Sequence, residues 1–285
     1  MLGYRHAFHA GNHADILKHI VLCDCLQYLT RKEKALLYCD THAGAGSYRI
    51  LEGYAAQNRE WESGLGRLLS RTNISDEPPA SVSRYLEILS DYQREDPDAY
   101  PGSPVLAARL LRPQDRLFFC ELHPADFEEL SARFSQDPRV RVRKEDGFFA
   151  LKSVLPPPSR RGLVFIDPSY EIPSDYDRAL AAVNDAVRRF ATGTILIWHP
   201  ILSRPDALSF PDRLLDLSDR PRLSFSLQVR SVAPGERGMI GSGMTILNPP
   251  WHLERSLQEV LPFLSRIFSQ DEKSEWSLRS FPVSV

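Results

Sequence analysis

The chain has 285 residues, a hydrophobic fraction of 42% and a formal net charge of -2 at pH 7. This size suits one large α/β domain with an insertion, or two small domains. The charge excludes a global basic field, so any nucleic-acid site must be a local patch. No apolar run approaches the roughly 20 residues of a membrane span, and the first residues lack a signal-peptide pattern, so we expect a cytoplasmic protein.

The chain begins with a polar, histidine-rich segment, residues 1–15, which we expect to be mobile in the free protein. A largely apolar helix is predicted from about Ala14 to Thr30. The apolar run Ala35–Cys39 predicts the first buried strand, which enters the glycine-bearing loop Asp40–Gly46. Residues 49–100 contain a predicted helix, Val82–Tyr92, and no evident strand, so we interpret them as a helical insertion within a single domain spanning residues 1–285.

Strands and helices alternate through the rest of the chain. We predict strands at Leu117–Cys120, Val140–Val142, Leu163–Ile166, Thr194–Trp198, Leu223–Val229 and Met244–Leu247. We predict helices at Ser103–Leu111, Pro124–Phe134, Phe148–Val154, Tyr176–Phe190 and His252–Leu264. The alternation predicts an α/β fold with a Rossmann-like parallel sheet, helices on both faces and an antiparallel edge.

The strand Leu163–Ile166 ends at Asp167 and Pro168, which place a carboxylate at the carboxyl edge of the sheet, where α/β folds bind ligands. The tetrapeptide Asp-Pro-Ser-Tyr resembles the Asp-Pro-Pro-Tyr site of methyltransferases that act on adenine N6. An exocyclic amine is a weak nucleophile because its lone pair is delocalised into the ring. Asp167 and the Pro168 carbonyl can each accept one N–H of that amine, and Tyr170 can stack on the base. The alternative is an ordinary Asp-Pro turn.

Other polar residues follow neighbouring strands, and each could face the same ligand. Asp40 and His42 follow the first strand. Glu121 follows the second and suits the hydroxyls of a ribose. Asp146 and Gly147 suit an adenine edge, with the carboxylate on the amine and the glycine backbone packed close. Each residue has a structural explanation when taken alone, but their shared edge favours one ligand site.

The ligand could be a dinucleotide or S-adenosylmethionine. The loop Asp40–Gly46 lacks the third glycine that packs a helix around a pyrophosphate. The acid at its start suits a ligand with an amino acid moiety. Ser103 is predicted to cap a helix whose free N–H groups could take a carboxylate. These features favour S-adenosylmethionine.

Several long segments resemble the RlmJ family of 23S ribosomal RNA (adenine-N6)-methyltransferases, and the resemblance covers nearly the whole chain. The matching segments are Tyr4–His19, Asp40–Gly46, Tyr100–Pro104, Glu121–Pro124 and Asp146–Phe148. The resemblance implies a Rossmann-type methyltransferase domain with a small helical subdomain inserted after the glycine loop. It also implies that one adenine of 23S ribosomal RNA is methylated, more readily before the RNA is assembled with protein.

The resemblance also implies roles for individual residues. Asp167 is the implied catalytic acceptor, Tyr4 is an implied contact to the substrate RNA, and we expect Arg5 to act with Tyr4. One departure is Ser169, which stands where the family usually has proline; it relaxes the turn and leaves both acceptor groups in place. The implied contacts to S-adenosylmethionine come from His19, His42, Ser103, Glu121, Asp146 and Gly147, with Lys18 close by.

A second tetrapeptide, Asn248-Pro249-Pro250-Trp251, also fits the adenine-methyltransferase pattern and follows an apolar strand. Its strand comes after three further strand-like segments, so we expect it elsewhere in the sheet. Pro249, Pro250 and Trp251 would then form a rigid, packed entry to the last helix.

Other candidate features are weaker. The histidines of the first 19 residues are scattered, and no cysteine or acid completes a tetrahedral set, so we predict no metal site. The four cysteines lack the spacing of a zinc site or disulfide frame and are expected in the core of a reduced protein. An RNA-facing patch or a solvated face could be formed by Arg139, Arg141, Arg143, Lys144, Arg160 and Arg161.

The sequence therefore predicts a monomeric, S-adenosylmethionine-dependent methyltransferase for adenine N6 in 23S ribosomal RNA. Methylation of DNA adenine or of a glutamine amide in protein is an alternative, because those enzymes use similar tetrapeptides. A non-catalytic RNA-binding module with a relict cofactor pocket is another.

Overall fold

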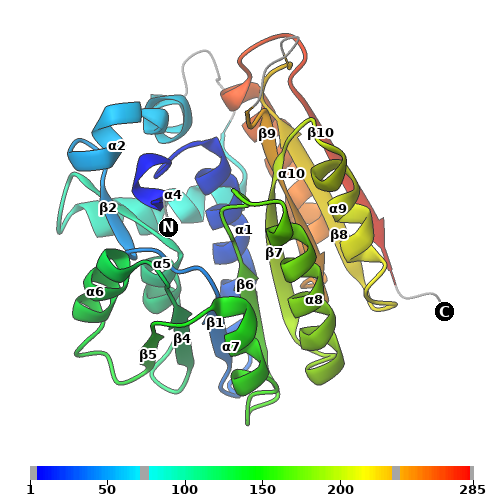
Figure 1. Ribbon diagram of the computed structural model, residues 1–285. Coiled ribbons are helices and arrows are strands. Elements are labelled where there is room, and N and C mark those ends of the chain that lie inside the picture. Colours follow the sequence, from blue (N-terminus) through cyan, green and yellow to red (C-terminus); the bar gives the residue numbers. More distant parts are fainter. Residues whose placement is uncertain (1–4, 71–76, 233–237, 283–285) are drawn as a thin grey trace.

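A central eight-stranded sheet organises the molecule (Figure 1), a computed structural model that describes residues 5–70, 77–232 and 238–282. The strand order is β10-β8-β9-β7-β6-β1-β4-β5. Helices α7, α8 and α9 cover one face of the sheet, and α1, α5 and α10 cover the other. Within the described ranges, every helix is too short or too polar to span a bilayer.

The strands of the main sheet are β1 (Leu37–Asp40), β4 (Arg116–Cys120), β5 (Val140–Arg143), β6 (Gly162–Ile166), β7 (Thr194–Ile201), β8 (Arg222–Gln228), β9 (Gly241–Leu247) and β10 (Glu275–Phe281). The longer helices are α1 (His13–Leu29), α4 (Ala80–Gln93), α5 (Ser103–Leu110), α6 (Pro124–Arg133), α7 (Gly147–Val154), α8 (Ser174–Arg189), α9 (Pro205–Leu215) and α10 (Leu253–Phe268). The short ones are η1 (His6–Phe8), α2 (Gly53–Asn58), η2 (Glu62–Gly66) and α3 (Arg67–Ser70).

Strand direction determines which loops can meet. Strands β5, β4, β1, β6 and β7 are parallel, whereas β9 is antiparallel to both β7 and β8, and β10 is antiparallel to β8. The predicted parallel sheet with an antiparallel edge is confirmed. The carboxyl ends of β1, β4, β5 and β6 therefore share one edge, while β9 ends at the opposite edge.

Residues 49–100, which we predict to be an insertion, contain α2, η2, α3 and α4, but they are not free of strands. Strands β2 (Ser47–Arg49) and β3 (Ala99–Pro101) form a two-stranded antiparallel sheet at the base of the insertion. Each has three residues, and their partners are about fifty positions apart, so no local pattern predicts them. The small sheet joins the two ends of the insertion.

Helix α1 is buried along most of its length because it packs against strand β9 of the sheet and against the helices α4, α5 and α10. Asn12 caps it, with Oδ1 accepting from the backbone N–H groups of Ala14 and Asp15. Its charged residues are therefore removed from water and must pair inside the protein. All four cysteines are buried and unpaired, as predicted.

Candidate active site

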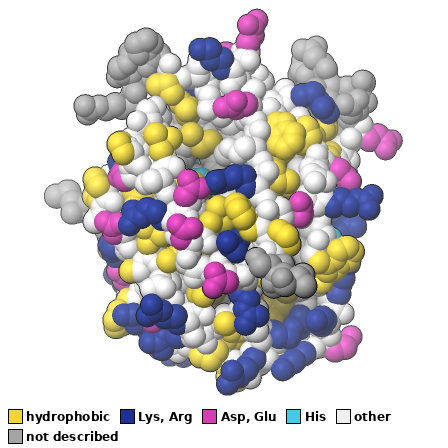
Figure 2. Space-filling model, turned by 90° about the vertical axis from the view of Figure 1, so that its right-hand side faces the viewer, with side chains coloured by type: hydrophobic (Ala, Val, Ile, Leu, Met, Phe, Trp, Pro, Cys, Tyr) yellow, Lys and Arg dark blue, Asp and Glu magenta, His cyan; other side chains and the backbone are white. Residues whose placement is uncertain are grey.

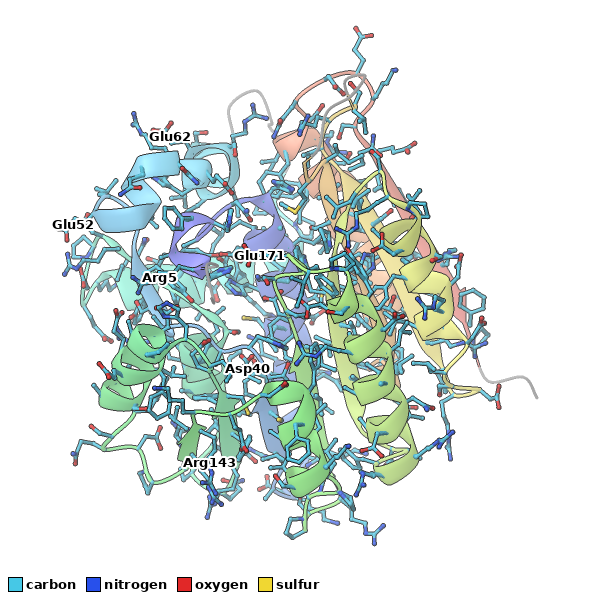
Figure 3. All side chains as sticks on the ribbon, viewed as in Figure 1. Arg5, Asp40, Glu52, Glu62, Arg143 and Glu171 are labelled. Atoms are coloured by element: carbon cyan, nitrogen blue, oxygen red, sulfur yellow. The ribbon has the colours of Figure 1, made fainter. Side chains whose placement is uncertain are left out.

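A cavity lies at the carboxyl ends of β1, β4, β5 and β6, as the strand-end residues predicted. In Figure 3, Glu171 lies above Asp40, on the segment that follows β6, and it belongs to the cavity wall. Glu121, Asp146 and Asp167 place three carboxylates in that wall. The predicted site residues that line the cavity are Lys18, His19, His42, Ser103, Glu121, Asp146, Gly147, Asp167 and Pro168.

Lys18 connects Asp167 to the interior of the protein. Its Nζ lies 2.6 Å from Oδ2 of Asp167 and 2.7 Å from Oδ1 of Asp15. Nε2 of His6 lies 2.9 Å from the other oxygen of Asp15. Oδ1 of Asp167 has no hydrogen-bond partner among the described residues, so this oxygen remains available to a ligand.

The charges in this network stabilise one another. Burial would lower the pKa of Lys18, but Asp15 and Asp167 raise it above its ordinary value. Burial would raise the pKa of Asp15, but His6 and Lys18 lower it well below its usual range. At neutral pH the network therefore contains a lysine cation between two carboxylates.

Asp40 does not line the cavity, contrary to the expectation that it contacts the ligand. Its carboxylate is fully buried and accepts hydrogen bonds from the Tyr38 hydroxyl (2.8 Å) and the Ser103 hydroxyl (2.7 Å). Ser103 in turn is not the helix cap: Gly102 occupies that position, and Ser103 is the first residue of α5. Asp40 is therefore a positioning residue that fixes the start of α5 at the cavity.

Burial raises the pKa of Asp40 to about 6, although Ser103 and Tyr38 oppose the shift. Because the folded-state pKa exceeds the unfolded value, this group favours folding most at low pH and loses that contribution as the pH rises towards 6. We expect Asp40→Asn, which cannot ionise, to lack this change. Between about pH 4 and about pH 7, the free energy of unfolding of the wild type should fall relative to the variant by up to about 3 kcal/mol. Urea titrations across this range measure the difference, and a pH-independent difference would contradict the assignment.

Glu121 organises the loop around the cavity. Its Oε2 accepts from the N–H of Gly44 (2.8 Å), and its Oε1 accepts from the N–H of His123 (2.6 Å). Burial raises the pKa of Glu121, while these two backbone donors favour its ionised form. A carboxylate has further lone pairs, so both oxygens can still accept from a ligand.

Asp146 and Gly147 lie where β5 passes into α7. Oδ1 of Asp146 accepts from the N–H of Phe148, which makes Asp146 the cap of α7, and its Oδ2 pairs with Arg178 of α8. A Cβ on Gly147 would overlap the carbonyl oxygen of Thr41. Only glycine therefore lets these two loops approach each other at the cavity.

Two histidines of the wall are neutral. Burial lowers the pKa of His19 to about 3, and Nδ1 of His19 lies 3.0 Å from the Tyr100 hydroxyl. Burial also lowers the pKa of His42 to about 4, and its Nδ1 lies 2.8 Å from the Thr41 hydroxyl. Each ring therefore offers neutral hydrogen-bonding groups to a ligand.

Tyr170 is not at the cavity, contrary to the expectation that it stacks on a base. Its side chain is buried, its hydroxyl donates to the carbonyl of Trp198 at 2.8 Å, and its ring packs on Tyr176 and Phe210. The positive φ of 52° turns this residue into the core after β6. The exposed apolar side chains that do line the cavity are Leu122 and Ile172.

The N-terminal segment is more ordered than expected. Arg5 extends toward α6 (Figure 3), where its guanidinium lies 2.6 Å from Asp126 and 3.7 Å from Glu129. His9 pairs with Glu60 of the insertion at 3.0 Å. The segment from Arg5 onward is thus tied to the rest of the protein. Tyr4 lies outside the described residues.

The second tetrapeptide lies away from the cavity, as predicted from its place in the chain, and the structure puts it at the opposite edge of the sheet. Leu247 at the end of β9 pairs with Ile195 at the start of β7, and the amide of Asn248 donates to the carbonyls of Ala191 and Gly193. Trp251 is not packed as expected, since 78% of it is exposed. Asn248 is therefore remote from the cavity and serves the local backbone.

Some wall residues escaped the sequence analysis. Thr41, whose hydroxyl donates to the carbonyl of Phe165, follows Asp40 directly and had no distinguishing pattern. Arg178 is the fifth residue of α8 and had no distinguishing pattern; it lines the cavity because α7 and α8 pack together. Among the described residues, no group of three or more His, Cys, Asp or Glu side chains is placed to hold a metal ion.

Comparison with known proteins identifies a family to which this chain is similar. A family model described as ribosomal RNA large subunit methyltransferase D, RlmJ, matches residues 33–279. Two relatives are named ribosomal RNA large subunit methyltransferase J. The one from Haemophilus influenzae is 42% identical to this chain over 98% of both chains, and the one from Escherichia coli is 42% identical over 93% of both chains. A crystal structure of a Legionella pneumophila protein is 33% identical, with a TM-score of 0.86, and covers 96% of this chain and 98% of that one.

The sheet order, with its reversed strand β9, and the acidic cavity at the carboxyl ends of the parallel strands define a Rossmann-like methyltransferase, a class of enzyme that uses S-adenosylmethionine. The match over most of the chain then identifies the particular group. The chain belongs to the RlmJ family of ribosomal RNA large subunit methyltransferases.

Proposed function

We propose that this protein transfers a methyl group from S-adenosylmethionine to the N6 amine of one adenine in 23S ribosomal RNA. It acts in the cytoplasm as a monomer, on RNA that is not yet fully assembled with protein. The observation that supports this proposal most is the common cavity of Asp167 and Pro168 with Glu121 and Asp146. An acceptor for the substrate amine and acceptors for a nucleoside cofactor thereby face one space.

The acceptor side of the cavity suits an adenine amine. Oδ1 of Asp167 can accept one N–H of the amine, and the Pro168 carbonyl can accept the other. Two such hydrogen bonds would fix the orientation of the amine, so that its nitrogen points at the methyl donor. Lys18 holds the other oxygen of Asp167 and thereby sets the direction of the free one.

The rest of the wall fits S-adenosylmethionine by charge and shape. This cofactor supplies an electrophilic methyl group on a sulfonium centre. Glu121 would accept from the ribose hydroxyls and Asp146 from the adenine amine, and the backbone of Gly147, which lines the cavity, would pack close to the adenine edge. Lys18, His19, His42 and Ser103 would complete the cofactor side. The carboxylates also suit the positive charges of the ligand.

The direct test is methyl transfer from labelled S-adenosylmethionine to protein-free 23S ribosomal RNA, followed by mass mapping of methylated adenines. The expected result is one modified adenine, absent from RNA of a deletion strain. Methylation only of matched DNA oligonucleotides, or of protein glutamine, would replace the proposed substrate. Absence of S-adenosylmethionine binding in calorimetry would favour a non-catalytic RNA-binding protein.

Glu121→Ala should weaken cofactor binding. The loss of charge-assisted ribose contacts is worth about 1.5–3 kcal/mol, or roughly ten- to a hundredfold in Kd. Because Glu121 also holds the N–H groups of Gly44 and His123, Glu121→Gln serves as a control that keeps one acceptor and the shape. Calorimetry with S-adenosylmethionine measures both variants, and wild-type affinity in Glu121→Ala would refute the ribose role.

Tyr4→Ala should act on RNA and not on the cofactor. Tyr4 directly precedes Arg5, which is anchored to α6 next to the cavity residues His123 and Asp126. We expect a higher KM for RNA or a lower kcat, with the Kd for S-adenosylmethionine unchanged. Wild-type kinetics in a protein that lacks residues 1–4 would rule this role out.

A further inference from the structure

A second cavity lies at the opposite edge of the central sheet, where α1 ends and where β6 and β7 begin. It has a volume of about 590 Å³ and none of the described residues that line it is acidic. Its cations and its aromatic ring come from the end of α1, the loop after it and the segment before β6. They are Tyr28, Arg31, Lys32, Lys34, Arg160 and Arg161, which we call the far-edge patch.

The backbone of the far-edge patch is held in place by two arginines. Arg112 donates to the carbonyls of Thr30 (2.8 Å) and Lys32 (2.7 Å), and Asp115 fixes its guanidinium at 3.0 Å. Arg161 donates to the carbonyl of Leu29 at 2.6 Å and to that of Lys34. The loop after α1 therefore has a defined shape before any ligand arrives.

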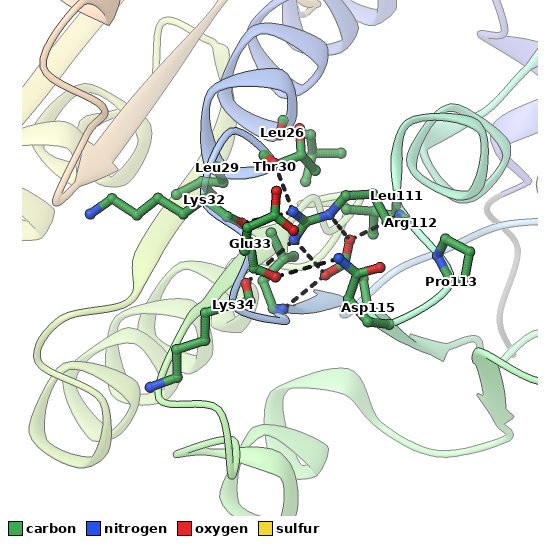
Figure 4. Close-up of polar contacts among 12 residues, drawn as sticks. Leu26, Leu29, Thr30, Lys32, Glu33, Lys34, Leu111, Arg112, Pro113 and Asp115 are labelled. Carbon is green, nitrogen blue, oxygen red and sulfur yellow. Dashed lines mark hydrogen bonds and ion pairs between the residues drawn. The ribbon is translucent and has the colours of Figure 1, made fainter.

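The lysines of this loop are not used by that network. Figure 4 shows the side chains of Lys32 and Lys34 extending away from the Arg112–Asp115 contacts, toward the same side. Both are exposed, and neither has an ion-pair partner among the described residues. Two cations are thus held on a fixed backbone without an ion-pair partner, while Glu33 between them has a Coulombic interaction with Arg112.

Aromatic rings adjoin these cations. The guanidinium of Arg31 lies 5.6 Å from the centre of the Tyr28 ring, and Tyr28 stacks on His252 at 4.9 Å. Nε2 of His252 lies 2.9 Å from Oδ1 of Asp24, which fixes the imidazole ring. The exposed Trp251 lies beside His252, and the centres of these two rings are 6.2 Å apart. Cations along a groove with accessible aromatic rings are the pattern by which proteins hold nucleic-acid strands.

The charge is local. The chain as a whole has a net charge of -2, so the cations of the far-edge patch are a local concentration. On the face in Figure 2, which looks onto the right-hand side of Figure 1, Lys and Arg side chains also gather at the lower end. Several separate cations on an open surface suit a row of phosphates better than one small anion, which would be enclosed by backbone N–H groups.

We propose that the far-edge patch binds the phosphate backbone of the substrate RNA, away from the adenine that enters the catalytic cavity, and that Trp251 stacks on an unpaired base beside it. This rests on the proposed function, because it takes the ligand to be the same RNA. The length of β6 alone separates the two edges by roughly 16 Å, at about 3.3 Å per residue. A long RNA can contact both edges, whereas a short hairpin seated in the catalytic cavity reaches only one.

The test compares Lys32→Ala/Lys34→Ala with the wild type. Binding to a 23S ribosomal RNA transcript is measured by fluorescence anisotropy at several salt concentrations, and kcat and KM are measured on a short hairpin that contains the methylated adenine. The matched control is Arg94→Ala/Lys273→Ala, which removes two exposed cations that line neither cavity. Trp251→Ala tests the stacking contact separately.

The expected result is weaker binding of the transcript, with a salt slope reduced by about one for each lysine removed. The affinity ratio of wild type to variant should therefore shrink about tenfold between about 50 and about 200 mM salt. Trp251→Ala should raise the Kd for the transcript by roughly fivefold or more. The hairpin kinetics and the Kd for S-adenosylmethionine should stay at wild-type values.

Three outcomes overturn the proposal. The first is equal weakening in the control variant, which would mean that only overall charge matters. The second is an unchanged salt slope, and the third is equal weakening on the hairpin. If the wild type binds the transcript through this edge but methylates no adenine, the binding site stands and the proposed function fails.

Discussion

Asp167→Ala should lose turnover by roughly 10²–10⁴-fold, the usual contribution of a positioned proton acceptor, while its Kd for S-adenosylmethionine stays within a few-fold of the wild type. The reason is that Asp167 has one oxygen on Lys18 and offers the other to the cavity, on the side away from Glu121 and Asp146 in the proposed arrangement. Single-turnover kinetics at saturating RNA isolate the chemical step. Retention of more than a tenth of wild-type turnover would contradict the assignment.

Three variants separate the chemistry from loss of fold and test the choice of site. Asp167→Asn keeps the shape and one acceptor oxygen but removes the charge that pairs with Lys18. Asn248→Ala changes the other tetrapeptide, at the far edge of the sheet, and should leave the chemical step intact while it removes hydrogen bonds to two carbonyls. Ser169→Pro restores the residue typical of the family and should preserve or raise turnover. A dead Asn248→Ala enzyme beside an active Asp167→Ala enzyme would reverse the choice of site.

The strand ends were predictable because a parallel strand has a strong local signature. Four consecutive apolar residues before Asp167 specify a strand covered on both faces, and a proline directly afterwards ends it. Parallel neighbours then bring Glu121, Asp146 and Asp167 to one edge by topology alone. The choice between the two tetrapeptides also followed from chain order, since β9 runs in the opposite direction to β7.

The side-chain directions were not predictable in the same way. Asp40 and Asp167 both follow central strands, yet Asp40 points into the core, where Tyr38 and Ser103 can satisfy it. Tyr170 has a left-handed backbone conformation that turns it away from the cavity. Each outcome depends on partners distant in sequence, which a local pattern does not specify. The same is true of the strands β2 and β3, which exist only as a pair.

Helix α9 and strand β10 were absent from the predicted elements. Pro211 inside α9 is untypical of a helix interior, and this residue hides the helical pattern in the sequence. The helix nevertheless packs on the sheet through the buried side chains of Phe210 and Leu214. Strand β10 is an edge strand whose residues are mostly exposed or half-buried, so it has little apolar alternation. Its pairing with β8, from Glu275 opposite Gln228 to Phe281 opposite Arg222, is what defines it.

Lys18→Met should cause the largest loss of stability among the site variants. Removal of one partner from a buried ion pair costs about 3–5 kcal/mol, because the remaining charge stays in the interior without compensation. Here the loss leaves Asp15 and Asp167 near each other, with His6 as the remaining side-chain partner of Asp15. We expect a lower free energy of unfolding in urea titrations, together with a large fall in turnover.

A second variant separates these two effects of Lys18. Asp15→Asn/Lys18→Met removes one buried carboxylate along with the cation, so much of the lost stability should return. Turnover should not return, because Oδ2 of Asp167 still lacks the ammonium that holds it 2.6 Å away and directs Oδ1 toward the cavity. The Kd for S-adenosylmethionine, measured by calorimetry, shows whether the cofactor side survives in the double variant. Recovery of stability and turnover together would show that Lys18 acts only through the fold, whereas recovery of stability alone assigns it to the positioning of Asp167.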